Sequence, residues 1–438
     1  MKVFLQSLGC SKNQVDSEMI LGVCKNLGFK ISNTPNNCDL LIVNTCAFIE
    51  KAREEAINTI LEIADYKTKK TKMIVSGCLS TRYKKELPAE LPEVDLFISI
   101  IDYSHLAELI SGLFDIKSKD NPQLDFCDRV YLSNADYMKY VRISDGCLNR
   151  CAFCAIPQIR GLLKSRTILD IKKEVEMHVK NNCKEINIIS QDTTNYGYDL
   201  EKRLMLVDLL KELVSIPGDF KIRLFYLYPE IVTDELIDFI KNNEKMIPYF
   251  DIPIQHSENK ILKKMLRRST KEEMKELFKK IRHEIPNAIL RTTVMVGFPY
   301  EEEEDVHNLC EFIKEIKFDR LGCFTFSLEE NTPATHYPQE ISEEEKMRRY
   351  NIVMDTQYPI SLSLNESHLG EITNVIIEGY DEDNLMYTGR NYAFAPDDID
   401  GIIYIAAHSE KQIGDIVKVK IVDADAYSLT AEEIDEEN

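Results

Sequence analysis

Three short apolar runs open the chain, and each of them ends in a cysteine. VFLQSLGC, LLIVNTC and KMIVSGC are rich in the aliphatic and β-branched residues of buried parallel strands. Between these runs, apolar residues recur with helical spacing over about residues 17–27 and 49–65. The order strand, helix, strand predicts a parallel α/β sheet at the N-terminus, in which successive strands end at the same edge.

The middle of the chain repeats the strand and helix pattern. Charged segments with helical periodicity, such as ILDIKKEVEMHVKNN and KEEMKELFKKIRHEI, alternate with apolar runs. The runs that read as strands cover residues 140–144, 185–190, 221–227, 249–254, 288–298 and 320–326. Six such units predict an incomplete (βα)6 barrel, a shortened relative of the eight-fold barrel, with its chemistry at the C-terminal ends of the strands.

The pattern changes after Pro359. ITNVIIEGY, NLMYTGRNY, GIIYIAA and DIVKVKIVDADAYSLTAEEI alternate apolar and polar residues between Gly and Asp turns, which predicts a small antiparallel β-barrel. The segment 119–135 has the composition of a linker between the first two domains. We therefore expect three domains, at residues 1–120, 133–365 and 367–434.

Composition and charge narrow the class of protein. The chain has 438 residues, 44% of them hydrophobic, and a formal net charge of −20. No run approaches the roughly 20 apolar residues that span a bilayer, and the N-terminus lacks the features of a signal peptide. Twelve cysteines in such a chain favour a reducing compartment, so we expect a cytoplasmic protein without membrane contact. The acidic balance argues against a direct nucleic-acid target.

Cys147, Cys151 and Cys154 form a C-x3-C-x2-C motif in DGCLNRCAFC, just past the first strand of the central domain. Three thiolates fill three corners of a [4Fe–4S] cluster and leave the fourth iron open to a substrate. The alternatives are a zinc site or unrelated thiols, but zinc motifs pair C-x2–4-C spacings with a second pair downstream. We interpret the motif as the ligand set of an open cluster.

Cys10, Cys46 and Cys78 end the three N-terminal strands, and each follows a Gly or Thr. A parallel sheet would bring them to one edge although 35 and 31 residues separate them, which predicts a second three-cysteine cluster. The alternative is three buried thiols, since free cysteine is a common core residue. We read the other six cysteines as structural: 24, 38, 127, 183, 310 and 323.

Polar residues follow several of the central strands, where a ligand would bind. We expect Gln191, Gln255 and Gly297 to contact a cofactor, although both glutamines could be ordinary strand-end residues. Asp192 could as well cap the following turn as hold a ligand. His256 reads as a helix-start or packing residue rather than a base, and Glu301 to Asp305 as the start of a helix. The basic residues Lys263, Lys264, Arg267, Arg268 and Lys271 read as a solvated helix face or, as an alternative, a substrate-facing patch.

The cysteine motif resembles the radical S-adenosylmethionine (radical-SAM) signature, with Phe153 as its aromatic residue. The three predicted domains in their order resemble the radical-SAM methylthiotransferases, whose C-terminal barrel is a TRAM domain. GCSKNQVDSE, SQDTTNYG, RLFYLYPE, YFDIPIQH and GRNYAFAPDDIDGIIY are similar to the branch that modifies a ribosomal protein (RimO type). The branch that modifies transfer RNA (MiaB type) typically starts with GCQMN. After GFP the family usually has Gly, and this chain has Tyr300.

The resemblance implies a specific chemistry. The cluster on Cys147, Cys151 and Cys154 would bind S-adenosylmethionine and cleave it to a carbon radical, with Phe153 packing on its adenine. The cluster on Cys10, Cys46 and Cys78 would carry the sulfur. The product would be a methylthio group on the β-carbon of an aspartate in ribosomal protein twelve of the small subunit. An electron donor such as flavodoxin is implied. The alternatives are a transfer-RNA adenosine methylthiotransferase and a non-catalytic electron carrier.

The last domain carries an unusual charge for a TRAM-like barrel. Residues 370–438 hold four basic and 17 acidic side chains, whereas RNA binding needs cations for phosphate. Two acidic loops, Asp381 to Asp383 and Asp397 to Asp400, predict a docking face for a basic ribosomal protein. The alternative is an acidic surface that only aids solubility.

Overall fold

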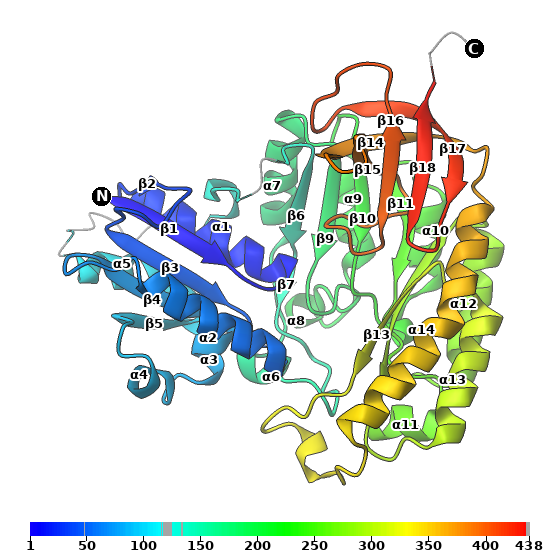
Figure 1. Ribbon diagram of the computed structural model, residues 1–438, viewed down its shortest axis with the longest axis horizontal. Helices are drawn as coiled ribbons and strands as arrows, with labels where there is room; N and C mark the ends of the chain where they lie inside the picture. The colour runs from blue at the N-terminus through cyan, green and yellow to red at the C-terminus, as the bar shows by residue number, and fades with distance from the viewer. Residues whose placement is uncertain (48, 115, 117–124, 133–134, 435–438) are drawn as a thin grey trace.

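The chain folds into an N-terminal α/β domain, a central open barrel and a small C-terminal barrel (Figure 1). The structure is a computed structural model that describes residues 1–47, 49–114, 116, 125–132 and 135–434. The expected domain ends at 120 and 133, part of the expected linker and the end of the acidic tail lie outside the described residues. No helix in the described part of the chain is both long and apolar enough to cross a membrane.

The N-terminal domain is a five-stranded parallel sheet in the order β2-β1-β3-β4-β5. The expected strands and helices are present, and α1 begins earlier than its apolar pattern, directly after Cys10. The strands are β1 (Lys2–Ser7), β2 (Lys30–Ile31), β3 (Leu40–Thr45), β4 (Lys72–Gly77) and β5 (Leu96–Ser99). The helices are α1 (Ser11–Asn26), α2 (Glu50–Ala64), α3 (Cys78–Arg82), α4 (Leu87–Glu90) and α5 (Leu106–Leu113).

The central domain has six parallel strands in the order β13-β12-β11-β10-β9-β6, and the sheet does not close. This is the incomplete barrel that the sequence predicts. The strands are β6 (Met138–Arg142), β9 (Glu185–Ile189), β10 (Lys221–Leu224), β11 (Met246–Asp251), β12 (Ile289–Val296) and β13 (Arg320–Thr325), with a short β7 (Ser144–Asp145) and β8 (Lys164–Ser165) pair.

Helices cover the outer face of the open barrel, and their apolar sides form one core with its strands (Figure 1). They are α7 (Ile168–Lys180), α9 (Leu206–Val214), α10 (Asp234–Lys241), α11 (Asn259–Lys264), α12 (Lys271–Glu284), α13 (Glu303–Ile316) and α14 (Glu343–Glu366). The short α6 (Ile156–Ile159) packs instead on the N-terminal domain, and α8 (Tyr198–Glu201) has no buried residues. Helix α14 continues through Pro359, and the change to short strands begins after it, at β14 (Ile372–Asp381).

The C-terminal domain is a closed five-stranded barrel, β14-β15-β16-β18-β17. Its strands are β14 (Ile372–Asp381), β15 (Met386–Arg390), β16 (Ile402–Ala406), β17 (Ile416–Ala424) and β18 (Ser428–Glu433). All its pairs are antiparallel except β16 with β18. The barrel packs on the starts of β9, β10 and β11, and Glu185 there accepts hydrogen bonds from Arg223 and Arg390.

Two carboxylates in one of the two acidic loops of this barrel contact the central domain. Asp397 accepts a hydrogen bond from the Tyr140 hydroxyl. Asp400 is buried and binds both Tyr249 and Arg291. These two carboxylates hold the C-terminal barrel against the central strands, while Asp397 and Asp398 remain exposed, so docking of a basic partner on this loop stays a prediction.

Candidate functional site

Cys10, Cys46 and Cys78 converge at one edge of the N-terminal sheet, as the sequence predicts. They follow β1, β3 and β4, which are neighbouring parallel strands. Cys10 is the residue before α1, and Cys78 is the first residue of α3. The three thiols are close enough for each of the other two to raise the pKa of Cys78.

Two glycines make this convergence possible. Gly9 has a φ of +85°, and a Cβ placed there would lie 2.8 Å from the Cβ of Cys46 and 3.1 Å from its sulfur. Gly77 has a φ of +95°, and its Cβ would lie 2.4 Å from the side-chain oxygen of Asn44. Since L-residues rarely adopt such φ values, and no side chain fits these spaces, the turns before Cys10 and Cys78 require glycine.

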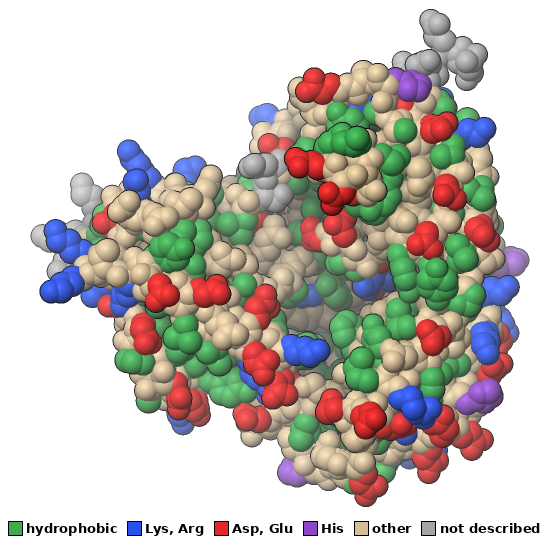
Figure 2. Space-filling view, viewed as in Figure 1, with side chains coloured by type: hydrophobic (Ala, Val, Ile, Leu, Met, Phe, Trp, Pro, Cys, Tyr) green, Lys and Arg blue, Asp and Glu red, His purple; other side chains and the backbone are tan. Residues whose placement is uncertain are grey.

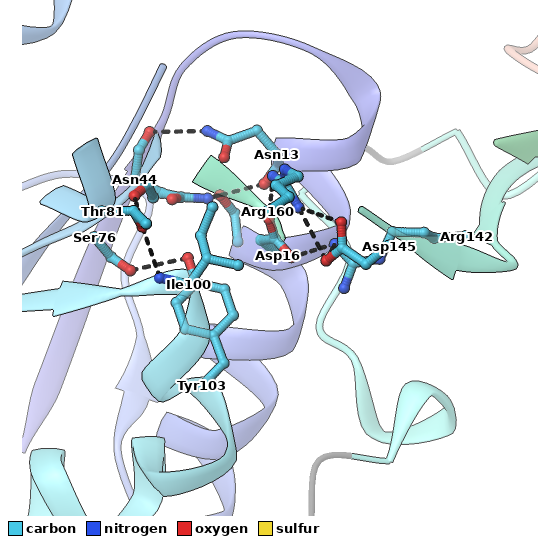
Figure 3. Close-up of polar contacts among 12 residues, drawn as sticks. Asn13, Asp16, Asn44, Ser76, Thr81, Ile100, Tyr103, Arg142, Asp145 and Arg160 are labelled. Atoms are coloured by element: carbon cyan, nitrogen blue, oxygen red, sulfur yellow. Dashed lines mark hydrogen bonds and ion pairs between the residues drawn. The ribbon is translucent and has the colours of Figure 1, made fainter. Parts of the chain in front are cut away.

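Asn13 and Asn44 fix the two turns relative to each other (Figure 3). The Asn44 amide donates to the backbone oxygen of Asn13 at 2.9 Å and to the Ser17 hydroxyl at 2.7 Å. The Asn13 amide donates in return to the backbone oxygens of Leu8, Asn44 and Thr45. The ends of β1 and β3, each directly followed by a cysteine turn, are thereby tied to the first turn of α1.

Burial and charge affect these thiols differently. Burial, with the other two cysteines nearby, raises the pKa of Cys78 to about 12. Burial also acts on Cys10, but Lys12 and Arg160, together with backbone N–H groups, outweigh it and leave the pKa of Cys10 lowered. A metal ligand must be a thiolate, so metal binding here would release the proton of Cys78.

Cys147, Cys151 and Cys154 lie on the loop after β6 and β7, at the C-terminal ends of the central strands. Gly146 opens the loop with a φ of +71°, and a Cβ there would lie 2.2 Å from the Leu162 carbonyl oxygen. The backbone of Ala152 is held from both sides, because its N–H donates to Met265 and its oxygen accepts from Ala334, each at 2.9 Å. Burial raises the pKa of Cys147 to about 11 and that of Cys154 to about 12.

Polar groups contact two of these sulfurs. The Asn149 backbone and side-chain N–H groups lie 3.4 and 3.5 Å from the Cys147 sulfur. The hydroxyl of Tyr228 lies 3.5 Å from the Cys151 sulfur, and the Arg267 guanidinium lies 4.0 Å from it. Hydrogen bonds to ligating sulfurs tune the potential of a cluster, so these residues can act on its electronics.

The interpretation of Arg267 as part of a solvated helix face is therefore wrong. Arg267 is buried, lies between α11 and α12, and stacks on the Tyr228 ring at 4.2 Å. Its neighbour Arg268 donates to the Asn149 side-chain oxygen at 2.9 Å. The charged residues looked like one helical stripe in the sequence, but the chain leaves the helix after Lys264 and turns two arginines toward the cysteine loop.

The other sequence candidates divide into groups with different environments. Gln191 is the most telling, because both polar atoms of its amide are buried without a hydrogen-bond partner. Gln255 has a φ of +69° and bridges to β12 through its backbone. A Cβ at Gly297 would meet Lys346 at 2.3 Å, so packing of α14 explains this glycine. Phe153 is half-buried, with its ring 6.4 Å from that of Phe298.

Asp192, His256 and the acidic run 301–305 make hydrogen bonds within the fold. Asp192 accepts from Thr194 and Asn195 in the turn that follows it, and also from Asn149 at 2.6 Å. His256 is buried, and its ring accepts the Glu258 N–H. The acidic run starts α13, where Glu302 and Asp305 form a capping box.

Tyr300 occupies a position that favours glycine. Its φ is +71°, which explains why Gly is the usual residue there. The Tyr300 ring lies 5.5 Å from the Tyr337 ring, and the Lys264 ammonium lies 4.2 Å above it. These contacts hold the exposed side chain in place and offset part of the backbone strain.

The two cysteine loops meet through a buried network of charges (Figure 3). Asp16 of α1 binds Arg142 of β6 and Arg160, which follows α6. Arg160 also donates to both oxygens of Asp145, at 3.1 and 3.2 Å. Close by, the Lys12 ammonium lies 3.3 Å from the centre of the Tyr226 ring. These residues could not be identified from the sequence, because nothing in the separate segments shows that they meet.

The residues present fit two iron–sulfur clusters and a bound cofactor. No group of His, Cys, Asp or Glu side chains in the described part of the chain could hold a single metal ion. A four-iron cluster needs a wider arrangement, because each cysteine binds a different iron. Two three-cysteine sets at neighbouring sites provide it, and the unpaired Gln191 amide beside the second set leaves donors and an acceptor for a polar ligand.

Three family models match the chain in sequence. They are described as uncharacterized protein family UPF0004 over residues 2–99, the radical SAM superfamily over 141–313 and the TRAM domain over 369–434.

Curated relatives match over nearly the full length. A protein of Acetivibrio thermocellus named ribosomal protein uS12 methylthiotransferase RimO is 43% identical, with 99% of each chain covered. The protein of the same name from Dictyoglomus thermophilum is 46% identical, with 97% of this chain and 98% of that one covered.

Solved structures share the fold at low sequence identity. The radical S-adenosylmethionine methyltransferase TsrM from Kitasatospora setae, with cobalamin and a [4Fe–4S] cluster bound, has a TM-score of 0.57 at 14% identity, and 78% of each chain is covered. The cobalamin-dependent radical enzyme OxsB has a TM-score of 0.52 at 12% identity, covering 81% of this chain and 56% of that one.

Proposed function

We propose the function from the premise that this chain belongs to the RimO family of ribosomal protein uS12 methylthiotransferases. It is a radical-SAM enzyme that replaces a hydrogen on the β-carbon of an aspartate of uS12 with a methylthio group. Its cofactors are two [4Fe–4S] clusters and S-adenosylmethionine. When bound, they supply the electron, the carbon radical and the methylthio sulfur.

The proposed ligands are Cys147, Cys151 and Cys154 for the cluster that binds S-adenosylmethionine, and Cys10, Cys46 and Cys78 for the auxiliary cluster. The observation that carries this assignment is that two three-cysteine sets from different domains lie at adjoining sites. Arg160 and Asp16, each six residues past a cysteine of its set, are bonded to each other. A group transfer between two clusters requires such proximity.

Other residues would hold the cofactor and exclude water. We propose that the free amide of Gln191 binds polar groups of S-adenosylmethionine, that Phe153 packs on its adenine, and that Gln255 and Gly297 line the same mouth. Asn149, Tyr228 and Arg267 orient the cysteine loop and donate to its sulfurs. Arg267 also screens Cys151 from solvent, because it is buried between that sulfur and the Pro253 carbonyl.

The partner is a basic ribosomal protein, and we propose that its docking involves the acidic C-terminal barrel. Figure 2 shows acidic side chains over this barrel, at the upper right of the view. Glu382 and Asp383 of the β14–β15 loop are exposed, and so are Asp397 and Asp398. A transfer-RNA target would need many cations on this domain, yet Arg390 is buried, Lys411 is paired with Glu433, and only Lys418 and Lys420 are exposed. We further propose a cytoplasmic enzyme served by an electron donor such as flavodoxin, without membrane contact.

Mass spectrometry of uS12 tests the function directly. A strain that lacks its own uS12 methylthiotransferase is complemented with this chain or with its Cys10→Ala variant. The wild-type chain should restore the mass of a methylthio group on the target aspartate, and the variant should not. Modified adenosine in transfer RNA from the same cells serves as the control. A change in the transfer RNA without a change in uS12 would overturn the proposal.

A further inference from the structure

Lys12 is placed between the two cysteine sets. It follows Cys10 by two residues, and its ammonium lies 3.3 Å from the centre of the Tyr226 ring. Tyr228 comes two residues after Tyr226, and its hydroxyl lies 3.5 Å from the Cys151 sulfur. The contact between Lys12 and Tyr226 is therefore a direct junction between the auxiliary site and the site for S-adenosylmethionine. A carbon atom that reacts with both must lie close to this junction.

The Lys12 side chain is largely buried, and its ammonium has no carboxylate partner among the described residues. Its residue is only 9% exposed, and no carboxylate lies within 4.0 Å of it and no hydrogen-bond acceptor contacts it among the residues that the structure describes. One helical turn further along α1, Asp16 is paired with two arginines. Burying an unpaired ammonium costs free energy, which the aromatic ring offsets in part. A folded protein keeps such a charge where an anion completes the site.

Tyr226 supports the reading of this junction as a binding site. It has a φ of +60°, in the left-handed region that an aromatic residue rarely adopts. Its N–H donates to the Asp251 carboxylate at 2.9 Å, which holds the strained turn. Backbone strain of this kind concentrates at sites that must present a side chain in one orientation. Here it presents the ring on which Lys12 lies.

We propose that Lys12 binds the side-chain carboxylate of the target aspartate and selects it over a neutral residue. This inference rests on the proposed function. In aspartate the β-carbon is bonded directly to the carboxylate carbon, so placing the β-carbon at the junction brings the carboxylate next to it. The surface is hollowed between the N-terminal domain and the rest of the molecule, with basic side chains in its depth (Figure 2). A loop of the substrate can enter there.

The other anion near Lys12 is the thiolate of Cys10. That thiolate also has Arg160 in its vicinity, and Arg160 acts on Cys78 as well. The auxiliary site thus has a second cation of its own. The Lys12 ammonium lies against the ring of the central domain, on the side where the substrate must approach the second cluster. These observations favour the substrate carboxylate over the thiolate as its partner.

Binding of two peptides to anaerobically reconstituted enzyme tests the inference. The peptides span the target loop of uS12 and carry either the aspartate or an asparagine in its place. The wild-type enzyme should bind the aspartate peptide about tenfold or more tightly than the asparagine peptide, as a charged hydrogen bond predicts. In Lys12→Met the two affinities should become equal. Lys12→Arg, which keeps the charge, should retain most of the preference.

Lys25→Met is the matched control, because Lys25 is exposed on the same helix and its loss changes the net charge equally. It should bind both peptides as the wild type does. Iron content and circular dichroism should be the same in all variants, and Lys12→Gln replaces Lys12→Met if the latter does not fold.

Undiminished preference for aspartate in Lys12→Met or Lys12→Gln overturns the inference. A shifted potential of the auxiliary cluster with the preference intact would also overturn it and assign Lys12 to the thiolates. If wild-type enzyme neither binds nor modifies the aspartate peptide, the proposed function itself fails, which is a different result.

Discussion

Arg160 donates a hydrogen bond of 2.7 Å to Asp16. This bond joins α1, which follows Cys10, to the segment that follows Cys154. Asp16 is fully buried and also binds Arg142. Three charged residues from two domains thus form one desolvated network. Such a network fixes orientation, because each partner left unpaired in the interior is costly.

Replacing Asp16 with Ala should destabilise the protein strongly. Two buried guanidinium groups would lose a shared carboxylate, so we expect the free energy of unfolding to fall by about 3–5 kcal/mol. Urea denaturation followed by circular dichroism measures this. Asp136→Ala is the control, because Asp136 is 88% exposed in its pair with Lys139 and should matter little. Equal stability of the two variants would contradict a structural role of the network.

The contact between the C-terminal barrel and the central domain should weaken in acid. Burial raises the pKa of Glu185, but Arg223 and Arg390 outweigh it and lower this pKa from 4.5 to about 2. A folded-state pKa below the unfolded one means that the unfolded chain binds more protons in this range. The stabilisation is therefore present above about pH 4.5 and is lost as the pH falls toward 2.

Urea midpoints measured from neutral pH down to about pH 3 test this prediction. Glu185→Gln should be less stable than wild type at neutral pH and should lose less stability in acid. Glu212→Gln, which removes a carboxylate from an exposed pair with Lys172, should follow the wild-type curve. Parallel curves for wild type and Glu185→Gln would show that this carboxylate does not carry the acid sensitivity.

Each cysteine set should hold half of the iron. If both sites hold [4Fe–4S] clusters, the reconstituted protein should contain about eight irons. Changing Cys147, Cys151 and Cys154 together to Ala should halve the iron and abolish cleavage of S-adenosylmethionine. Changing Cys10, Cys46 and Cys78 should halve the iron and leave cleavage measurable. Cys24→Ala, which removes a buried thiol outside both sets, is the control and should keep the full iron content. Full iron content in the Cys10, Cys46 and Cys78 triple variant would exclude the auxiliary site.

Phe153 should contribute to binding of S-adenosylmethionine. An aromatic ring stacked on a base is worth about 1–3 kcal/mol, so Phe153→Ala should weaken the affinity by roughly tenfold or more. Equilibrium titration of the reconstituted enzyme measures it, with iron content as a check on the cluster. Tyr66→Ala, which removes an exposed aromatic ring of the N-terminal domain, is the control. Unchanged affinity for S-adenosylmethionine would contradict the prediction and show that Phe153 only packs against Phe298.

Charge reversal in the β14–β15 loop should slow modification of uS12. Glu382→Lys with Asp383→Lys would oppose a basic partner, so we expect slower turnover at low salt and a weaker dependence of turnover on salt. Glu212→Lys with Glu276→Lys, on outer helices of the central domain, changes the charge equally. If both double variants modify uS12 as fast as wild type, docking through this loop is excluded.

Much of the architecture follows from periodicity alone. The strands before Cys10, Cys46 and Cys78 and the six central strands are where the apolar runs predict them, because buried parallel strands leave near-continuous apolar segments. The path of α14 through Pro359 could not be predicted, because packing of its buried side on β13 and α13 outweighs the local preference.

The site was predictable only in part, for a physical reason. Cysteine ligands can be recognised in a sequence by residue type and spacing. Nothing in the sequence distinguishes Lys12, Asp16 and Arg160 from other charged residues, because their contacts form only when the domains pack. Asp400 shows the same limit, since this one residue of an acidic loop is buried against Arg291 although its neighbours are exposed. Charge in a sequence indicates what a residue can bind, but only the tertiary contacts show whether that capacity is already used.

Glu185 binds Arg223 within the central domain and Arg390 from the C-terminal barrel. Arg390 comes 205 residues after Glu185 in the chain. During synthesis the central strands therefore emerge long before the residue that completes their buried charge pairs. The central domain can reach its final state only when nearly the whole polypeptide has been made, so a chain that stops short of residue 390 leaves that interior unfinished.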